Sequence, residues 1–163
     1  MRKSEREVVS FEEKAEILMH CKSMTLALQE EDGPYLVPLN FGAEKQGENL
    51  VLYFHCAVEG KKLALLRKNA NVGFCAYTMF RVFNKGVAPC GYTTDYESVS
   101  GKGTAEIVTD ERERMHGLKV LMAHYTEEKF SDEMFSAKAL AITTVVKITV
   151  REWTGKRLVR ETV

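Results

Sequence analysis

Short apolar runs separated by polar turns fill most of the first third of the chain. The runs MTLALQE (24–30) and YLVPLNFG (35–42) are strand-like, and the turn formers Glu-Asp-Gly-Pro lie between them. After a polar stretch at 44–49, the run LVLYFH (50–55) alternates two sets of side chains, as a strand does. This pattern predicts a hairpin, a second turn at 44–49, and a third strand that ends at His55.

Three more strands are predicted farther along the chain, at 71–83, 98–108 and 139–153. The last of them is rich in β-branched residues and looks like a closing strand. Between the first two lies NKGVAPCGYTTDYE (84–97), which is too polar and turn-rich for a core element. The chain therefore predicts six strands in a meander.

Helix signals occur at three places. Ser10 followed by Glu13 is typical of a capping box, and Asp110 followed by Glu113 marks a second helix start. A short helix with a cationic end is predicted from near Gly60. Strands and helices do not alternate regularly, so a doubly wound parallel sheet is disfavoured. We expect one domain over residues 1–163, mainly β with peripheral helices (α+β), built as a mixed barrel.

Composition narrows the function classes. At 163 residues and 45% apolar content, the chain is long enough for one core and a small-molecule site. Lys plus Arg and Asp plus Glu both total 23, so no net field attracts nucleic acid or an anionic membrane. The longest apolar runs are too short to cross a bilayer, and the charged N-terminus is unlike a signal peptide. We expect a cytoplasmic protein with neither nucleic acid nor membrane as partner.

The four cysteines are Cys21, Cys56, Cys75 and Cys90. Their spacing contains no CxxC pair and no nearby histidine pair of the zinc-binding kind, so no metal site is expected. In a reducing compartment they are predicted to be free thiols.

The stretch YFHCAVEGKK (53–62) passes from a strand end into a helix start. Such a corner offers free backbone N–H groups and the positive end of a helix dipole, and Gly60 allows close approach of a ligand. Lys61 and Lys62 are cations in the first turn, where an anion such as a phosphate would offset the unfavourable dipole. The alternative is that both lysines are ordinary solvated side chains.

Pro38 interrupts the apolar run PYLVPLNFG. Proline cannot donate to a strand ladder, so an edge strand with exposed backbone groups is predicted, and a flat heterocycle could use those groups together with the amide of Asn40. An ordinary strand edge that ends in a turn explains the pattern equally well.

The stretch YESVSGKGTAE contains GKGTAE, which nearly matches the dinucleotide fingerprint. It lacks the last glycine and lies in a strand, so a Rossmann site is rejected. The hydroxyls of Tyr96, Ser98 and Ser100 are candidate ligand contacts, or they simply face water.

Together these stretches resemble the pyridoxamine 5'-phosphate oxidase-like flavoproteins, and most of all their nitroimidazole-resistance (Nim) branch. The resemblance rests on MRKSERE, PYLVPLNFG, LYFHCAVEGKKLALLRKNANV, YESVSGKGTAEIV and KITVREWTGK, in this order. It implies a homodimer of six-stranded split β-barrels with one FMN in each of two clefts between the subunits.

The resemblance also implies which residues would hold the FMN. One strand would lie along the isoalloxazine ring, the corner after it would cradle the phosphate, and a later stretch and a tryptophan would line the cofactor. These residues are Val37, Pro38, Leu39, Asn40 and Phe41; His55, Cys56, Ala57, Lys61 and Lys62; and Ser98, Val99 and Trp153.

The implied activity is FMN-dependent reduction of small electrophiles such as nitroimidazole or other nitroaromatic compounds. A reduced nicotinamide or another donor would supply the electrons. His55 is the candidate catalytic residue, because an imidazole can donate a proton near neutral pH. A structural hydrogen bond is the alternative role for His55. The sequence lacks the arginine-rich signature of the oxidase branch, although Arg157 and Arg160 are present, so oxidation of pyridoxamine phosphate is doubtful.

Two other functions stay open at this point. A haem-binding or haem-degrading split barrel would need His20, His55, His116 or His124 as an axial ligand, and the last two are predicted to be surface residues. A non-catalytic flavin-binding or storage protein would need no catalytic residue. Cys56 as a thiolate nucleophile is weighed as well and disfavoured, because no orienting group is evident.

Overall fold

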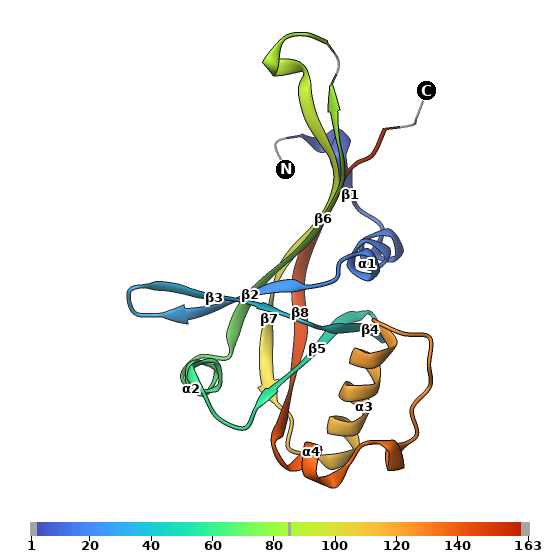
Figure 1. Cartoon of the computed structure of the whole chain (residues 1–163). Coiled ribbons are helices and arrows are strands. Elements are labelled where there is room, and N and C mark those ends of the chain that lie inside the picture. The colour runs from blue at the N-terminus through green and yellow to red at the C-terminus, as the bar shows by residue number, and fades with distance from the viewer. Residues whose placement is uncertain (1–2, 85, 161–163) are drawn as a thin grey trace.

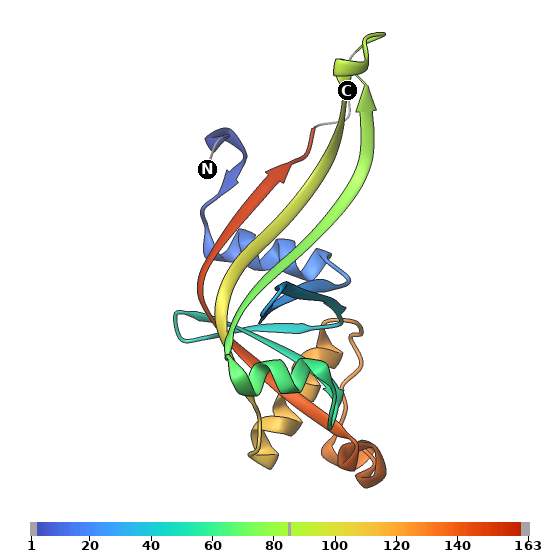
Figure 2. The same ribbon diagram turned by 90° about the vertical axis from the view of Figure 1, so that its left-hand side faces the viewer.

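A computed structural model of the chain describes residues 3–84 and 86–160 (Figures 1 and 2). The strands are β1 Glu7–Val8, β2 Met24–Glu30, β3 Gly33–Leu39, β4 Gly42–Gln46, β5 Asn49–Ala57, β6 Asn71–Asn84, β7 Tyr92–Ile107 and β8 Thr143–Leu158. The α-helices are α1 Phe11–His20, α2 Lys61–Lys68, α3 Glu111–Ala123 and α4 Ala137–Ala141. Short 3-10 turns cover Ser4–Arg6, Pro89–Gly91 and Asp132–Met134.

The strands form one antiparallel sheet in the order β3-β2-β6-β7-β8-β5-β4, and β1 pairs with β8. The prediction of a mainly β protein with peripheral helices is confirmed. The predicted number of six strands is wrong, because the sheet has eight. Within the described residues, β3 and β4 end the order without pairing to each other, so the sheet is strongly curved but not closed.

Strand β4 was missed because its sequence is polar. The stretch 44–49 was predicted to be a turn, but only Gly47 and Glu48 connect β4 to β5, with Gly47 at φ 60°. The polar side chains of β4 are used by its neighbours: Glu44 accepts from Nε2 of His116 at 2.8 Å, and Gln46 donates to the Tyr53 hydroxyl at 3.1 Å. Tertiary contacts to α3 and β5 therefore override the local turn preference.

Two other boundaries differ from the prediction. Residues 92–97 belong to β7 rather than to a loop, because their acidic side chains are buried and paired: Asp95 bonds Arg81 at 2.7 Å, for example. At the other end, residues 139–141 lie in α4, so the closing strand starts at Thr143.

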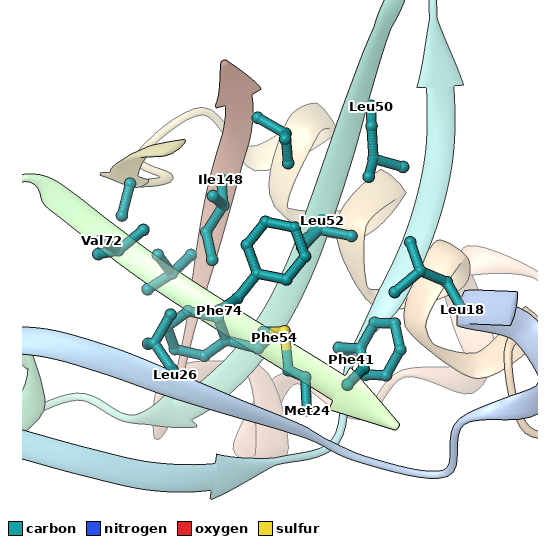
Figure 3. Packing of buried hydrophobic residues seen from close by; sticks show 14 of the residues in the cluster. Leu18, Met24, Leu26, Phe41, Leu50, Leu52, Phe54, Val72, Phe74 and Ile148 are labelled. Atoms are coloured by element: carbon teal, nitrogen blue, oxygen red, sulfur yellow. The ribbon is translucent and has the colours of Figure 1, made fainter. Parts of the chain in front are cut away.

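The core lies inside the curved sheet, where side chains from β2, β5, β6 and β8 meet (Figure 3). Met24, Leu52 and Phe54 are at most 1% exposed. The predicted alternation in β5 is confirmed, because Leu52 and Phe54 face this core whereas Val51 and Tyr53 pack in a second cluster with α3. One face of β5 therefore packs in the main core, and the other face packs against α3.

The helix starts follow the predicted signals. The hydroxyl of Ser10 accepts from the Glu13 N–H at 3.4 Å, and the carboxylate of Asp110 accepts from the Glu113 N–H at 2.9 Å. Gly60 precedes α2 with φ 133°, a conformation that side chains rarely adopt, so this position requires glycine. All three predicted helices are present.

Strands β6 and β7 extend beyond the body of the protein as a long arm (Figure 1). Apolar side chains on this arm are exposed to solvent: Tyr77, Met79, Phe80 and Val82 are each at least 53% exposed. Neighbouring exposed apolar side chains of this kind are typical of an interaction site.

His124 follows α3 and is buried, at 6% exposure, so the expectation that it lies on the surface is wrong. Its Nε2 donates to the carbonyl of Cys21 at 2.8 Å, and its ring packs on Phe41 at 4.5 Å between centroids. The Tyr125 hydroxyl accepts from the Phe41 N–H and donates to the carbonyl of Lys22, both at 3.0 Å. This cluster, His124 with Tyr125, fixes the chain just after β3.

We expect this cluster to make the protein acid-sensitive. Burial lowers the pKa of His124 below the ordinary value of 6.5. Its Nδ1 is buried and has no hydrogen-bond partner among the described residues, so the folded state disfavours a second proton, and Lys22 adds unfavourable charge. The unfolded chain takes up that proton first, so stability is full above about pH 6.5 and declines as the pH falls below it.

Urea unfolding at about pH 7.5 and about pH 5 measures this effect. His124→Gln keeps a donor for the Cys21 carbonyl but cannot titrate, so it should lose less stability on acidification than the parent protein. His116→Gln changes a half-exposed histidine and should lose as much as the parent. An equal acid loss in His124→Gln and the parent would contradict the assignment.

Candidate cofactor site

The corner between β5 and α2 brings the two predicted lysines close to the β2–β3 hairpin and to β5. Lys61 Nζ lies 2.7 Å from the Glu30 carboxylate at the end of β2 and 4.8 Å from the centre of the Tyr35 ring in β3. Lys62 Nζ lies 5.3 Å from the centre of the Phe54 ring in β5. The start of α2 therefore spans the gap between the β2–β3 hairpin and β5.

The electrostatics of this corner favour an anion. The first turn of α2 has no acidic residue, and Gly60 offers no side chain to cap its N–H groups. Two ammonium groups at the N-terminus of a helix are repelled by its partial positive charge, and a nearby negative group offsets this repulsion. Glu30 supplies one carboxylate to Lys61, whereas the described residues supply no ion pair to Lys62.

Strand β3 is an edge strand, as Pro38 predicts. In the described residues it pairs only with β2, and Pro38 lies opposite Thr25. Its side chains alternate: Val37 and Leu39 are half-buried against the core, whereas Pro38 and Asn40 are exposed. One edge of β3 thus has backbone N–H and C=O groups available to a ligand, near the cationic start of α2.

His55 and Cys56 point to opposite faces of β5, because side chains of a strand alternate. Cys56 packs against the core, and burial raises the pKa of its thiol while Lys62 partly opposes this. A raised pKa disfavours the thiolate nucleophile. His55 is exposed and faces α3 and α4, so its ring lies on the other side of β5 from the lysines.

For two of the predicted cofactor contacts, Phe41 and Ala57, the structure gives no sign of a ligand site. Phe41 is fully buried in the core, and its N–H already donates to the Tyr125 hydroxyl. Ala57 is exposed at the last position of β5, opposite Thr143. A role in cofactor binding stays a prediction for both.

The remaining predicted contacts lie far from the corner within one chain. His55 pairs with Val145 on β8, and Trp153 is eight positions farther along the same strand, about 26 Å at 3.3 Å per residue. Ser98 and Val99 pair with β8 just beyond Trp153. Val99 is fully buried, and Ser98 is half-buried. A hollow of ≈ 400 Å³ lies beside Trp153 and Ser100.

The sequence did not reveal Glu30 and Tyr35 as neighbours of the lysines. Both belong to the β2–β3 hairpin, whose register brings them next to α2 only after the sheet curves. The sequence shows an acidic and an aromatic residue at these positions. Because they are far from Lys61 along the chain, nothing in the sequence indicates that they contact it.

The arginines near the C-terminus are engaged in ion pairs. Arg157 bonds Glu97, Glu16 and Glu13, and Arg160 bonds Asp95 at 3.0 Å. The guanidinium groups of both arginines are thus held by carboxylates.

Residues 3–84 and 86–160 contain no group of three or more histidine, cysteine or carboxylate side chains placed to hold a metal ion. No helix in these ranges is both long and apolar enough to cross a bilayer. The four cysteines are free thiols.

Several solved structures share this fold. A candidate 5-nitroimidazole antibiotic resistance protein from Bacteroides thetaiotaomicron is 29% identical, with a TM-score of 0.77 over 92% of this chain and 85% of that one. The flavocytochrome Anf3 from Azotobacter vinelandii is 16% identical, with a TM-score of 0.80 over 98% and 72% of the two chains. A FAD- and haem-binding protein from Mycobacterium smegmatis is 22% identical, with a TM-score of 0.73 over 93% and 73%.

Among curated proteins, none matches the sequence. A sequence family does match: residues 11–157 fit the family described as pyridoxamine 5'-phosphate oxidase. The match covers nearly the whole chain, and the fold agrees with solved proteins of the same kind. This chain therefore belongs to the pyridoxamine 5'-phosphate oxidase family.

Proposed function

We propose that this protein is an FMN-dependent oxidoreductase that reduces small electrophiles, including nitroaromatic compounds. The observation that carries the proposal is the paired lysines at the start of α2, beside the free edge of β3. When bound, FMN would supply the electron chemistry. The chain's own residues would bind and orient the cofactor and provide a proton.

The start of α2 is suited to the phosphate of FMN. Gly60 has no Cβ, and a Cβ built there would contact nothing, so the space in front of the helix is open. Lys61 and Lys62 would each give charge-assisted hydrogen bonds to phosphate oxygens, and free N–H groups of the first turn would add to them. A dianionic group would also remove the repulsion between the two ammonium groups.

Strand β3 is suited to the flat ring system. The backbone groups of alternate residues of β3 face its free edge, Asn40 follows at the end of the strand, and Pro38 keeps the ladder on that edge open. We assign this edge to the polar rim of the isoalloxazine ring.

A homodimer would complete the site. The corner at α2 and the group of Ser98, Val99 and Trp153 are separated by much of β8, so one cofactor does not reach both within one chain. In a two-fold dimer, the corner of each copy would meet the Ser98, Val99 and Trp153 group of its partner. The exposed apolar side chains of the β6–β7 arm, Tyr77, Met79, Phe80 and Val82, give such an interface its hydrophobic surface.

His55 would serve as proton donor to the reduced substrate. It is exposed two positions before the end of β5, on the face of the strand opposite the lysines, and no hydrogen bond within the described residues holds its ring. An imidazole gains and loses a proton near neutral pH, so it can donate as negative charge develops on the substrate. A reduced nicotinamide in the cytoplasm is our proposed electron source.

Haem binding is a second candidate function, since two proteins of this fold are described as a flavocytochrome and a FAD- and haem-binding protein. Of the four histidines, His20 is paired with Glu97, His116 with Glu44, and His124 with the Cys21 carbonyl. His55 would have to be the axial ligand.

Absorption spectra separate the two functions. The purified protein, mixed with FMN and freed of excess cofactor, should show flavin bands and then bleach on anaerobic reduction. Its colour should return when a nitroaromatic compound is added. A Soret band instead would favour haem, and bound flavin that no acceptor reoxidises would favour storage.

Glu30 is expected to weaken phosphate binding at this site, because its carboxylate already occupies Lys61 and would lie near the phosphate. Glu30→Gln should therefore bind FMN about 2- to 5-fold more tightly, since an exposed charge pair contributes up to about 1 kcal/mol. Isothermal titration measures this change. Riboflavin, which has no phosphate, should bind both proteins equally. Equal FMN affinities would remove Glu30 from the site.

A further inference from the structure

The β6–β7 arm becomes a two-stranded ribbon where its third strand ends. Within the described residues, the last position of β8 that pairs with β7 is Leu158, opposite Tyr96. The register of β6 against β7 shifts between Met79 and Arg81 at the same level, so Phe80 is an extra residue there. A bulge of this kind re-aims side chains, and Phe80 is 53% exposed.

Ion pairs fix the base of this ribbon. The carboxylate of Asp95, which is 1% exposed, accepts from Arg81 Nε at 2.7 Å and from Arg160 Nη1 at 3.0 Å. Arg81 also donates to the carbonyl of Arg160 at 2.8 Å. Two strands by themselves are marginally stable in water, so these buried pairs give the arm a set direction. The exposed ring of Phe80 is therefore preorganised for a contact outside its own chain.

An apolar hollow of ≈ 200 Å³ lies at the other end of the molecule, between the end of β5, α3 and α4 (Figure 1). Hydrocarbon side chains make up most of its lining, among them Leu118, Met122, Phe135 and Leu140. His55 and Thr143 are polar, but the Thr143 hydroxyl already donates to the Ala139 carbonyl at 2.8 Å. The lining offers no fixed charge to repay the desolvation of an ion, so it favours a hydrocarbon group.

The size of the hollow matches one phenyl ring. A cavity of about 150 Å³ lined by apolar side chains takes a benzene ring. More apolar surface adjoins the lining: Ile142, next to Thr143, is 65% exposed, and Met134, next to Phe135, is 64% exposed. Exposed apolar side chains around an apolar hollow are typical of a contact with another protein.

Phe80 does not reach this hollow within one chain. Thr143 begins β8 and Leu158 ends it, 15 positions apart, or about 50 Å at 3.3 Å per residue. A two-fold axis across the middle of β8 exchanges the two ends, because the strands of the two copies then run in opposite directions. The arm of each copy would then lie at the α4 end of its partner.

The dimer proposed above gives this contact its register. Its corner, level with Val145 on β8, meets the partner's Trp153 and the partner's Ser98, the second of which is level with position 156 of β8. Position 158 is five beyond 153 and two beyond 156, so it comes level with a position five or two before 145, which is 140 or 143. Phe80 lies at the level of position 158 and thus arrives at α4 and the start of β8, beside the hollow.

We propose that the phenyl ring of Phe80 in each copy fills the hollow of its partner. The proposal rests on the two-fold dimer of the proposed function and adds a contact on the other face of β5 from the cofactor corner. The partner of this surface is a second copy of the chain, and each dimer has two such contacts.

Methyl NMR detects the contact at a concentration where parent and variants are dimers. The chain has 7 methionines, so labelled methyl groups give a short spectrum in which Met122→Leu identifies the Met122 signal. A phenyl ring in the hollow displaces this signal by its ring current. Phe80→Ala should therefore shift the Met122 signal and leave that of Met24, which is 1% exposed in the core, unchanged.

Phe83→Ala is the matched control for this shift. It removes the same ring from the same strand, but the Phe83 ring lies against the guanidinium groups of Arg81 and Arg160, at 5.8 and 5.0 Å from its centre. The Met122 signal should not move in this variant.

Dimer dissociation gives a second measurement. Phe80→Ala should raise the dissociation constant at least about 10-fold, since two buried aromatic contacts are lost per dimer. Ala139→Phe fills the hollow and should have the same effect. Ala137→Phe makes the same change at an exposed residue of α4 outside the lining, and its dissociation constant should stay within about 3-fold of the parent. Sedimentation over a dilution series measures these constants, and thermal unfolding shows that each variant is folded.

Mixing the variants shows whether the contact joins two copies. A heterodimer of the Phe80→Ala chain and the Ala139→Phe chain keeps one of its two contacts, because Phe80 of the second chain meets the open hollow of the first. The mixture should therefore dimerise more tightly than either variant alone. A mixture that dimerises no better than its components would contradict the proposal.

The outcomes separate this contact from the proposed function. A dimer whose Met122 signal is the same in Phe80→Ala and the parent overturns the contact alone, whether or not the protein binds FMN. A dimer that shows the contact but binds no FMN supports the contact and overturns the oxidoreductase. A protein that stays monomeric with and without FMN overturns both the contact and the two-fold cofactor site.

Discussion

Replacing Lys61 and Lys62 together by alanine is expected to weaken FMN binding by about 2 to 4 kcal/mol, or roughly 30- to 900-fold. The reason is the loss of two charge-assisted phosphate contacts at the start of α2, where the described residues pair only Lys61 with a carboxylate. Fluorescence titration of the flavin-free protein with FMN measures the change, because flavin emission responds to binding.

The control for this variant uses the other end of the same helix. Arg67→Ala with Lys68→Ala removes two exposed cations from the last turn of α2, so net charge falls equally while the phosphate corner is intact. Its FMN affinity should stay within about 3-fold of the parent. Riboflavin should bind the parent and both double variants alike. Unchanged FMN affinity in the Lys61/Lys62 variant would remove the phosphate assignment.

His55→Ala is expected to keep its flavin but to reduce a nitroaromatic compound about 100-fold more slowly, as for the loss of a general acid. His55 is exposed at the end of β5, so its removal leaves the core of Leu52, Phe54 and Ile148 unchanged. Single-turnover mixing of the reduced protein with the acceptor isolates this step from the electron donor.

His116→Ala is the matched control for the histidine. This side chain is also half-exposed, but it lies on α3 and pairs with Glu44, away from the corner. Its turnover should equal that of the parent. If His55→Ala reacts as fast as the parent, His55 has a structural role only, and the proton must come from another group or from water.

Much of the fold was predictable from local signals. The capping residues Ser10 and Asp110 started helices where expected, and Pro38 marked an edge strand. The alternation in LVLYFH separated the two faces of β5 correctly. These predictions succeeded because each depends on a few adjacent residues whose backbone preferences or periodicity decide the outcome.

The errors share a physical cause. Strand β4 and the first part of β7 have polar sequences that lack a strand pattern, yet they pair because Glu44, Asp95 and Glu97 find partners on distant elements. His124 was assigned to the surface because a histidine on a helix is commonly exposed. The Cys21 carbonyl and the Phe41 ring, both distant in sequence, bury it.

The sequence by itself determined the starts of α1, α2 and α3, the edge position of the strand that contains Pro38, the cationic corner at Lys61 and Lys62, and the family resemblance. Only the tertiary structure decided that the described residues form an open sheet of eight strands and that Glu30 pairs with Lys61. It also decided what lies on each face of β5, where His55 points toward α3 and Cys56 packs in the core. The reason is that propensity, capping and charge act over a few residues. Strand pairing, burial and ion pairs depend on curvature of the sheet, which brings residues far apart in sequence into contact.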